Sequence, residues 1–202
     1  PQNMLMQLAV TTSLATIIVT SLSATYVHDR KRAVLWAPVR RIAPGLLIGA
    51  SLGALLADLV SSGVLRIIFG LFEILVGIQM WLNLKPKAHS VLPGTLGLMS
   101  SGFGIGLLST LMGIGGGTLT VPFLLWCNVN MRNAVAVSSA CGFPIAFAAT
   151  IALVIVGWNE EAIPAHSLGY LYWPAAIIIS AMTIFFAPLG ARLAHYFPIV
   201  TL

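Results

Sequence analysis

Charged residues are unusually rare in this sequence. Charged residues make up only 7% of its 202 residues, whereas hydrophobic residues make up 58%. About a quarter of the residues in a soluble domain are charged, so the composition excludes a soluble globular protein.

The basic residues form no long stripe that would suit nucleic acid. Half of them gather in one short segment, at Arg30, Lys31, Arg32, Arg40 and Arg41. Such clustering between apolar stretches is typical of the cytoplasmic loops of membrane proteins.

Motifs of common catalytic and metal centres are also missing. The two cysteines, Cys127 and Cys141, form no CxxC pair, and the four histidines have neither an HExxH nor a zinc-ligand spacing. No nucleotide-binding motif occurs, and the first residues do not have the pattern of a removable signal peptide. We therefore predict reduced, packed cysteines, no metal, no cofactor and no catalytic residues.

Long apolar runs dominate what is present. Because about 20 helical residues cross the hydrocarbon core, we predict an all-α, polytopic integral membrane protein with six spans. The spans cover residues 5–27, 42–58, 64–84, 94–126, 134–158 and 169–194. In the second span, Gly45, Gly49 and Gly53 recur every four residues, which predicts close packing of another helix. Tyr170, Tyr172 and Trp173, at the start of the last span, are expected to form an aromatic anchor at the membrane interface.

The basic residues predict the orientation of these spans. If the loop at residues 28–41 is cytoplasmic, alternation places residues 85–90 on the same side and the turn at residues 59–63 outside. Alternation also places Arg132 outside and the acidic loop at residues 159–167 inside.

One stretch of the fourth span is poorly suited to a continuous helix. Residues 113–117 contain four glycines, and Pro122 follows shortly after, a combination that weakens a helix. Broken backbone within a bilayer persists only where protein buries it or a wet cavity solvates it. Thr118 is placed to cap a new half-helix that runs toward Trp126. The N-terminal amides of such a half-helix favour an anion, as in transporters with discontinuous helices. The alternative is that the glycines only admit a neighbouring helix.

Two short matches predict an internal repeat. Ala9–Ser13 (AVTTS) aligns with Ala134–Ser138 (AVAVS), and Ala50–Ala54 (ASLGA) aligns with Ala187–Ala191 (APLGA). Each match alone is weak, but the two occur in the same order.

The repeat divides the chain into two parts. Residues 1–92 would belong to repeat one and residues 93–202 to repeat two. Four helices in each repeat, an even number, predict that the two repeats run parallel through the membrane. The partners of the first and last helices would then fall before Pro1 and beyond Leu202, so the chain is expected to be a fragment that lacks both.

These motifs resemble the sulfite exporter TauE/SafE family. Gly113–Pro122 (GIGGGTLTVP) followed by Arg132–Ser139 (RNAVAVSS) is similar to the family's second-repeat signature, and Gln7–Leu14 (QLAVTTSL) is similar to the second half of that signature in repeat one. Leu65–Gly70 resembles the family's fourth span. The resemblance implies a multi-pass transporter of the inner (plasma) membrane. Members with an assigned substrate are linked to sulfite, sulfoacetate or other small organosulfonates, so the resemblance implies a small anion without identifying it.

The candidate substrate-binding residues lie at the predicted break and where the following helices begin. They are Gly113, Gly115, Gly116, Gly117, Thr118, Ser138, Ser139, Thr12 and Ser13. The hydroxyls could donate to oxyanion oxygens, or only bond back to a carbonyl one turn earlier, and the sequence leaves both open. Glu73 is the only acid well inside a span, and it is either a proton-coupling residue or a neutral acid that fixes helix packing.

The favoured function is secondary transport or export of a small anion such as sulfite or an organosulfonate, without enzymatic activity. Two alternatives stay open, an intramembrane enzyme and a non-transporting membrane partner protein. The expected partners are the anionic substrate and the lipid bilayer, with no nucleic acid, and the sequence does not decide between a monomer and a homo-oligomer.

Overall fold

The structure is a computed structural model that describes residues 4–82, 91–160 and 163–196. Seven α-helices account for most of these residues, so the predicted all-α fold class is confirmed. In chain order the elements are α1 (Leu5–Arg30), α2 (Trp36–Leu59), α3 (Ser62–Trp81), α4 (Thr95–Met112), α5 (Gly117–Trp126), α6 (Met131–Val156), a 3-10 turn (Gly157–Asn159), β1 (Ser167–Leu168), β2 (Leu171–Tyr172) and α7 (Trp173–Tyr196). Within the described residues, five helices (α1, α2, α3, α4 and α6) are long and apolar enough to cross a membrane.

The helix boundaries follow local signals in the sequence. The side-chain oxygen of Asn130 accepts a hydrogen bond from the Asn133 amide at 2.9 Å, which satisfies an N–H of the first turn of α6. α2 begins at Trp36, earlier than predicted, so Arg40 and Arg41 lie inside a helix and not in the loop before it.

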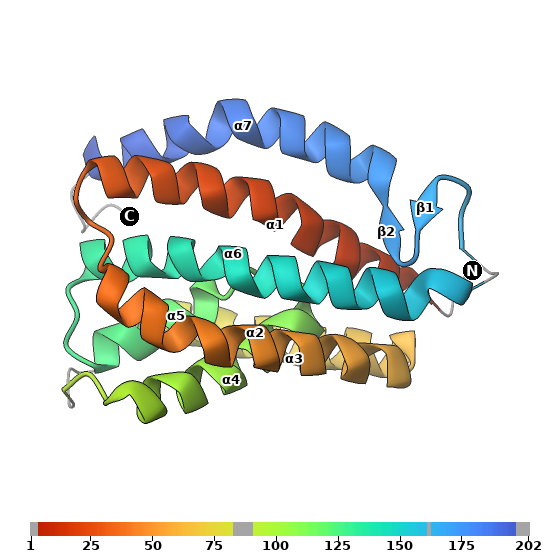
Figure 1. Ribbon diagram of the computed structural model, residues 1–202, viewed down its shortest axis with the longest axis horizontal. Coiled ribbons are helices and arrows are strands. Elements are labelled where there is room, and N and C mark those ends of the chain that lie inside the picture. The colour runs from red at the N-terminus through yellow and green to blue at the C-terminus, as the bar shows by residue number, and fades with distance from the viewer. Residues whose placement is uncertain (1–3, 83–90, 161–162, 197–202) are drawn as a thin grey trace.

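The helices stack side by side in the order α7, α1, α6, α2 and α4 (Figure 1). α6 is the central element, because it packs against α1, α2 and α5, and its residues Cys141, Ile145 and Leu153 are fully buried. α3 lies at the periphery and exposes large apolar side chains such as Ile67 and Leu75. Exposed apolar surface of this kind suits a helix that faces lipid.

The α2 glycines pack against α4, as their spacing predicts. A methyl group added at Gly45 or Gly49 would collide with the backbone carbonyl of Met99 or Phe103, and one added at Gly53 would lie 2.7 Å from the Leu107 carbonyl oxygen. The two helix backbones are therefore in direct contact.

The prediction that residues 94–126 form one crossing span is wrong, because α4 and α5 form a hairpin. α4 runs parallel to α2, since Gly45 lies beside Met99 and Gly53 beside Leu107. α5 runs back antiparallel to α6 and ends just before α6 begins. At that point the Arg132 Nη2 donates a hydrogen bond to the Lys31 carbonyl at 3.2 Å. The hairpin therefore enters and leaves at the end of the bundle that carries the basic loop.

This hairpin corrects the predicted orientation of the second half of the chain. Arg132 lies at the same end as the basic loop, not at the opposite end. The loop after α6 lies at the other end, because the Tyr170 hydroxyl donates to Asp58 Oδ1, near the C-terminus of α2, at 2.7 Å. The described arginines, except Arg66, thus gather at one end, in better agreement with the positive-inside rule than the six-span arrangement. The predicted loop at residues 85–90 lies outside the described residues.

The hairpin also corrects the predicted direction of the repeats. α1 and α6, which the repeat makes equivalent, run in opposite directions, and so do α2 and α7 (Figure 1). The even number of crossings depended on counting residues 94–126 as one span. A hairpin adds no crossing, so each predicted repeat crosses an odd number of times, and the two would be inverted rather than parallel.

Polar contacts hold the end that lies away from the basic loop. Gln7 Nε2 donates to the carbonyls of Ala57 at 3.3 Å and Val60 at 3.0 Å, and the Ser62 hydroxyl donates to Gln7 Oε1. Of the three aromatic residues predicted to anchor the last span at the interface, Tyr170 is only 2% exposed and packs within the protein, whereas Tyr172 and Trp173 are 37% and 40% exposed.

Candidate functional site

The break predicted within the glycine-rich stretch is present. α4 ends at Met112 and α5 begins at Gly117. Gly113 and Gly116 have φ angles of 67° and 74°, in the left-handed region that glycine occupies without a steric penalty. Gly113 closes α4, since its N–H donates to the Thr110 carbonyl and the next N–H donates to the Ser109 carbonyl. Glycine at these two positions therefore makes the reversal of the chain possible.

The break lies near the middle of the bundle. Gly115 is close to Ile17 of α1, and its carbonyl oxygen lies beside Gly142 of α6. Both neighbours are close to the midpoints of their helices. The irregular backbone is thus held among helices at a depth where lipid could not satisfy its polar groups.

The N-terminus of α5 presents unpaired amides at this depth. Within the described part of the chain, no hydrogen-bond acceptor is found for the N–H groups of Gly115, Gly116, Gly117 or Thr118. Successive N–H groups after a left-handed residue form an anion-binding concavity, and the helix dipole adds partial positive charge. Gly117 and Thr118 are exposed, so an anion could approach these donors.

Ser138 and Ser13 reach the break from two different helices. The Ser138 hydroxyl of α6 lies 3.5 Å from the position of a methyl group added at Gly117. The Ser13 hydroxyl of α1 donates to the Gly113 carbonyl at 2.9 Å. The Ser138 hydroxyl therefore lies beside the N-terminus of α5, whereas the hydrogen bond from Ser13 holds the end of α4 at the break.

The other predicted hydroxyls have structural contacts. Thr118 does not cap α5, because Gly116 occupies the N-cap position and no side chain caps this helix. The Thr12 hydroxyl accepts a hydrogen bond from the Tyr172 amide at 3.2 Å. The Ser139 hydroxyl donates to the Val135 carbonyl one turn earlier, at 3.0 Å. The alternative reading, a bond back to the helix, thus holds for Ser139.

Two hydroxyls that the sequence did not single out lie at the break. Ser109 Oγ and Thr120 Oγ1 lie 3.6 and 3.4 Å from the position of a methyl group added at Gly116. Both residues are fully buried, and neither hydroxyl has a hydrogen-bond partner among the described residues. A buried hydroxyl without a partner costs free energy unless a ligand or water satisfies it. Thr120 belongs to the quoted GIGGGTLTVP motif, but only the fold brings Ser109 beside it.

Other features of the described chain do not contribute to this site. Glu73 is exposed on α3 and forms no ion pair with a described residue, so the structure does not connect it with the break. An apolar groove of about 470 Å³ lies between α1 and α7; its lining includes Val19, Trp173 and Ile184, and it contains no charged side chain. No group of His, Cys, Asp or Glu in the described residues could hold a metal ion. Cys127 and Cys141 are free and buried, as predicted.

Long apolar helices surround a hairpin whose turn lies near the middle of the bundle and has unpaired backbone N–H groups. These features define the class of protein: a polytopic α-helical membrane protein with a discontinuous helix. The sequence profile of the sulfite exporter TauE/SafE family matches residues 4–202. The chain belongs to this family, as its motifs predict.

Three similar proteins have names of the same kind. The chain is 31% identical over 205 residues to a "Probable membrane transporter protein" of Haemophilus influenzae, covering 100% of this chain and 77% of the relative. It is 26% identical over 191 residues to a "Probable membrane transporter protein" of Methanocaldococcus jannaschii, covering 92% and 69%. It is 31% identical over 143 residues to the Bacillus subtilis "Probable membrane transporter protein YunE", covering 61% and 52%. No solved structure matches the chain significantly. These names indicate a membrane transporter.

Proposed function

We propose that this protein transports a small oxyanion, such as sulfite or an organosulfonate, and that the anion binds at the N-terminus of α5. The observation that carries the proposal is the set of unpaired amides at Gly115–Thr118 in the middle of the bundle. Ser138 would donate a further hydrogen bond, and Ser109 and Thr120 would line the inner wall. Hydrogen bonds to charged groups contribute about 1.5–3 kcal/mol each, enough to replace part of the hydration shell that the anion loses.

The proposed process is secondary transport across the inner membrane, without a chemical reaction. Neutral donors hold the anion without a covalent step, and the relatives' names indicate transport rather than catalysis. By the positive-inside rule, the end that carries Arg132 and the basic loop would face the cytoplasm. The anion would then reach the break when the helices around the hairpin move relative to it.

Flux of radiolabelled sulfite into proteoliposomes tests the binding site. Gly117→Leu places a side chain over the free amides, and we expect flux to fall about tenfold or more, the effect of losing one hydrogen bond to a charged group. Ser138→Ala should reduce flux less, because the amides remain. Gly104→Leu in α4 is the matched control, since nothing lies within 4 Å of a methyl group added there. Equal flux in the Gly117→Leu and Gly104→Leu variants would contradict the site.

Proton coupling through Glu73 is a separate proposal that rests on its place within an apolar helix. Glu73→Gln removes the ionisable group and keeps its size. If Glu73 carries the coupled proton, the variant loses the stimulation of sulfite flux by an imposed pH gradient but keeps flux down a sulfite gradient. Unchanged stimulation would exclude this role and would leave the binding site at α5 untouched.

A further inference from the structure

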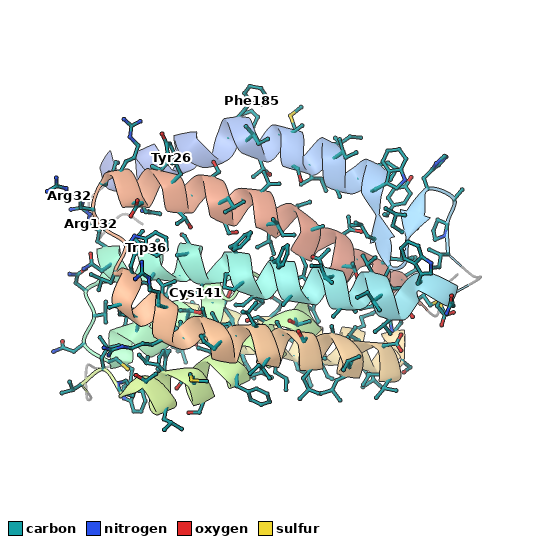
Figure 2. The ribbon with its side chains drawn as sticks, viewed as in Figure 1. Tyr26, Arg32, Trp36, Arg132, Cys141 and Phe185 are labelled. Carbon is teal, nitrogen blue, oxygen red and sulfur yellow. The ribbon has the colours of Figure 1, made fainter. Side chains whose placement is uncertain are left out.

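The cations at one end of the bundle form a single surface, which we call the basic cap. It consists of Arg30, Lys31 and Arg32 at the end of α1, Arg40 and Arg41 in α2, and Arg132 in α6. All five arginines are exposed. Figure 2 shows Arg32 and Arg132 at the same end of the bundle, where Trp36 also lies. Three segments far apart in the sequence thus contribute to one charged face.

Specific contacts hold the basic cap in place. Arg132 is tied to the loop after α1 by its hydrogen bond to the Lys31 carbonyl. The Arg30 guanidinium lies 5.7 Å from the centre of the Tyr26 ring. Asp29, the one acid in the segment 28–41, accepts a hydrogen bond from Trp36 Nε1 at 2.8 Å. No ion pair with an acidic side chain of the described residues neutralises the cap.

The positive-inside rule accounts for the side on which these residues lie, but not for their positions within the helices. Arg132 is the second residue of α6, and Arg40 lies in the second turn of α2. Both helices begin at this end, so the positive ends of their dipoles point at the cations, an arrangement that the macrodipole disfavours. Asp29 is the one acid in the segment 28–41, so the cap keeps a net positive charge.

We propose that the basic cap binds the phosphate headgroup of an anionic phospholipid such as phosphatidylglycerol. Its aromatic border favours a lipid over free phosphate. Tyr26 and Trp36 are 64% and 43% exposed beside the cap, at the level where interfacial aromatic residues contact headgroups. Below them, Leu22 of α1 and Leu47 of α2 are exposed and offer apolar surface to the acyl chains.

Retention of lipid by the purified 202-residue chain tests this proposal. The chain in detergent is supplied with equal amounts of phosphatidylglycerol and phosphatidylcholine, and native mass spectrometry counts the molecules that stay bound. We expect preferential retention of phosphatidylglycerol, reduced by added salt. Because one basic residue near the headgroups changes binding about fivefold, the Arg40→Gln, Arg41→Gln double variant should lower this retention by more than tenfold. It leaves the Arg132–Lys31 hydrogen bond intact.

Arg66→Gln is the control, since Arg66 is exposed on α3 at the opposite end of the bundle, and it should retain lipid as the natural chain does. Equal retention of the two lipids by the natural chain, or unchanged retention in the double variant, would overturn the proposal. So would complete displacement of the lipid by an excess of inorganic phosphate, because the cap would then be a site for free phosphate.

Discussion

At the scale of single residues, Gly113 and Gly116 decide the geometry of the break. Their left-handed φ angles could be anticipated from the glycine content of residues 113–117. The roles of the nearby hydroxyl groups could not be predicted from the sequence, because they depend on contacts between distant segments. Ser138 and Ser139 are neighbours in the sequence, yet one faces the α5 N-terminus and the other bonds back to its own helix. Ser109 becomes a candidate only because the hairpin folds it against Gly116.

Tyr170→Phe tests the hydrogen bond between Tyr170 and Asp58, at the end of the bundle opposite the basic cap. Burial, and then the hydrogen bond to Asp58, raise the pKa of Tyr170. A raised pKa means that the folded state favours the neutral phenol. This stabilisation is complete below the ordinary pKa of about 10 and is lost as the pH rises above it.

We expect Tyr170→Phe to lower the free energy of unfolding at pH 7 by about 1–2 kcal/mol and to flatten the alkaline loss of stability above about pH 10. Thermal unfolding in detergent across this pH range measures both effects. Tyr26→Phe is the control, because Tyr26 is exposed and its ring can still lie beside Arg30. If the two variants have the same alkaline profile, Tyr170 does not stabilise the fold through its hydroxyl.

At the scale of elements, the sequence was informative about helices and less informative about their connections. The apolar runs and the spacing of Gly45, Gly49 and Gly53 predicted the helices and one packing surface correctly. The reversal at residues 113–116 could not be predicted, because a glycine-rich gap permits both a continued crossing and a hairpin. The long-range contacts of Gly113 with Val10 and of α4 with α2 select the hairpin, and they are not visible in local sequence.

Gly49→Ala tests the contact between α2 and α4. A methyl group here would collide with the carbonyl of Phe103, so the helices must separate, and we expect a loss of about 1–3 kcal/mol in stability. Gly77→Ala in α3 is the matched control, since nothing lies within 4 Å of an added methyl group. It should leave stability unchanged or raise it by up to about 1 kcal/mol, the difference in helix propensity. Chemical unfolding followed by circular dichroism compares them, and equal stability of both variants would contradict the backbone contact.

At the scale of the whole molecule, the hairpin changes what the charge distribution means. With six crossings, Arg132 would lie on the outer side, against the positive-inside rule. With α4 and α5 returning to the same end, the basic cap and the Tyr170–Asp58 contact lie at opposite ends of the bundle. α4 and α5 then both extend from the basic end of the bundle to the break. The neighbouring helices α1 and α6 run past the break in opposite directions. The orientation of the molecule and the position of its candidate site thus depend on the same reversal.

Cysteine labelling from the two sides of the membrane distinguishes the hairpin from a sixth crossing. Cysteines are introduced singly at Arg40, Met131 and Trp158, which are all exposed, and are treated with a membrane-impermeant maleimide in spheroplasts and in inverted vesicles. The hairpin predicts that Arg40→Cys and Met131→Cys react from one side and Trp158→Cys from the other. The unmodified chain gives the background, which should be low because burial raises the pKa of the Cys127 thiol and Cys141 is fully buried. Reaction of Met131→Cys from the same side as Trp158→Cys would mean that α4 and α5 do not return together, and the site proposed at the α5 N-terminus would then lose its position.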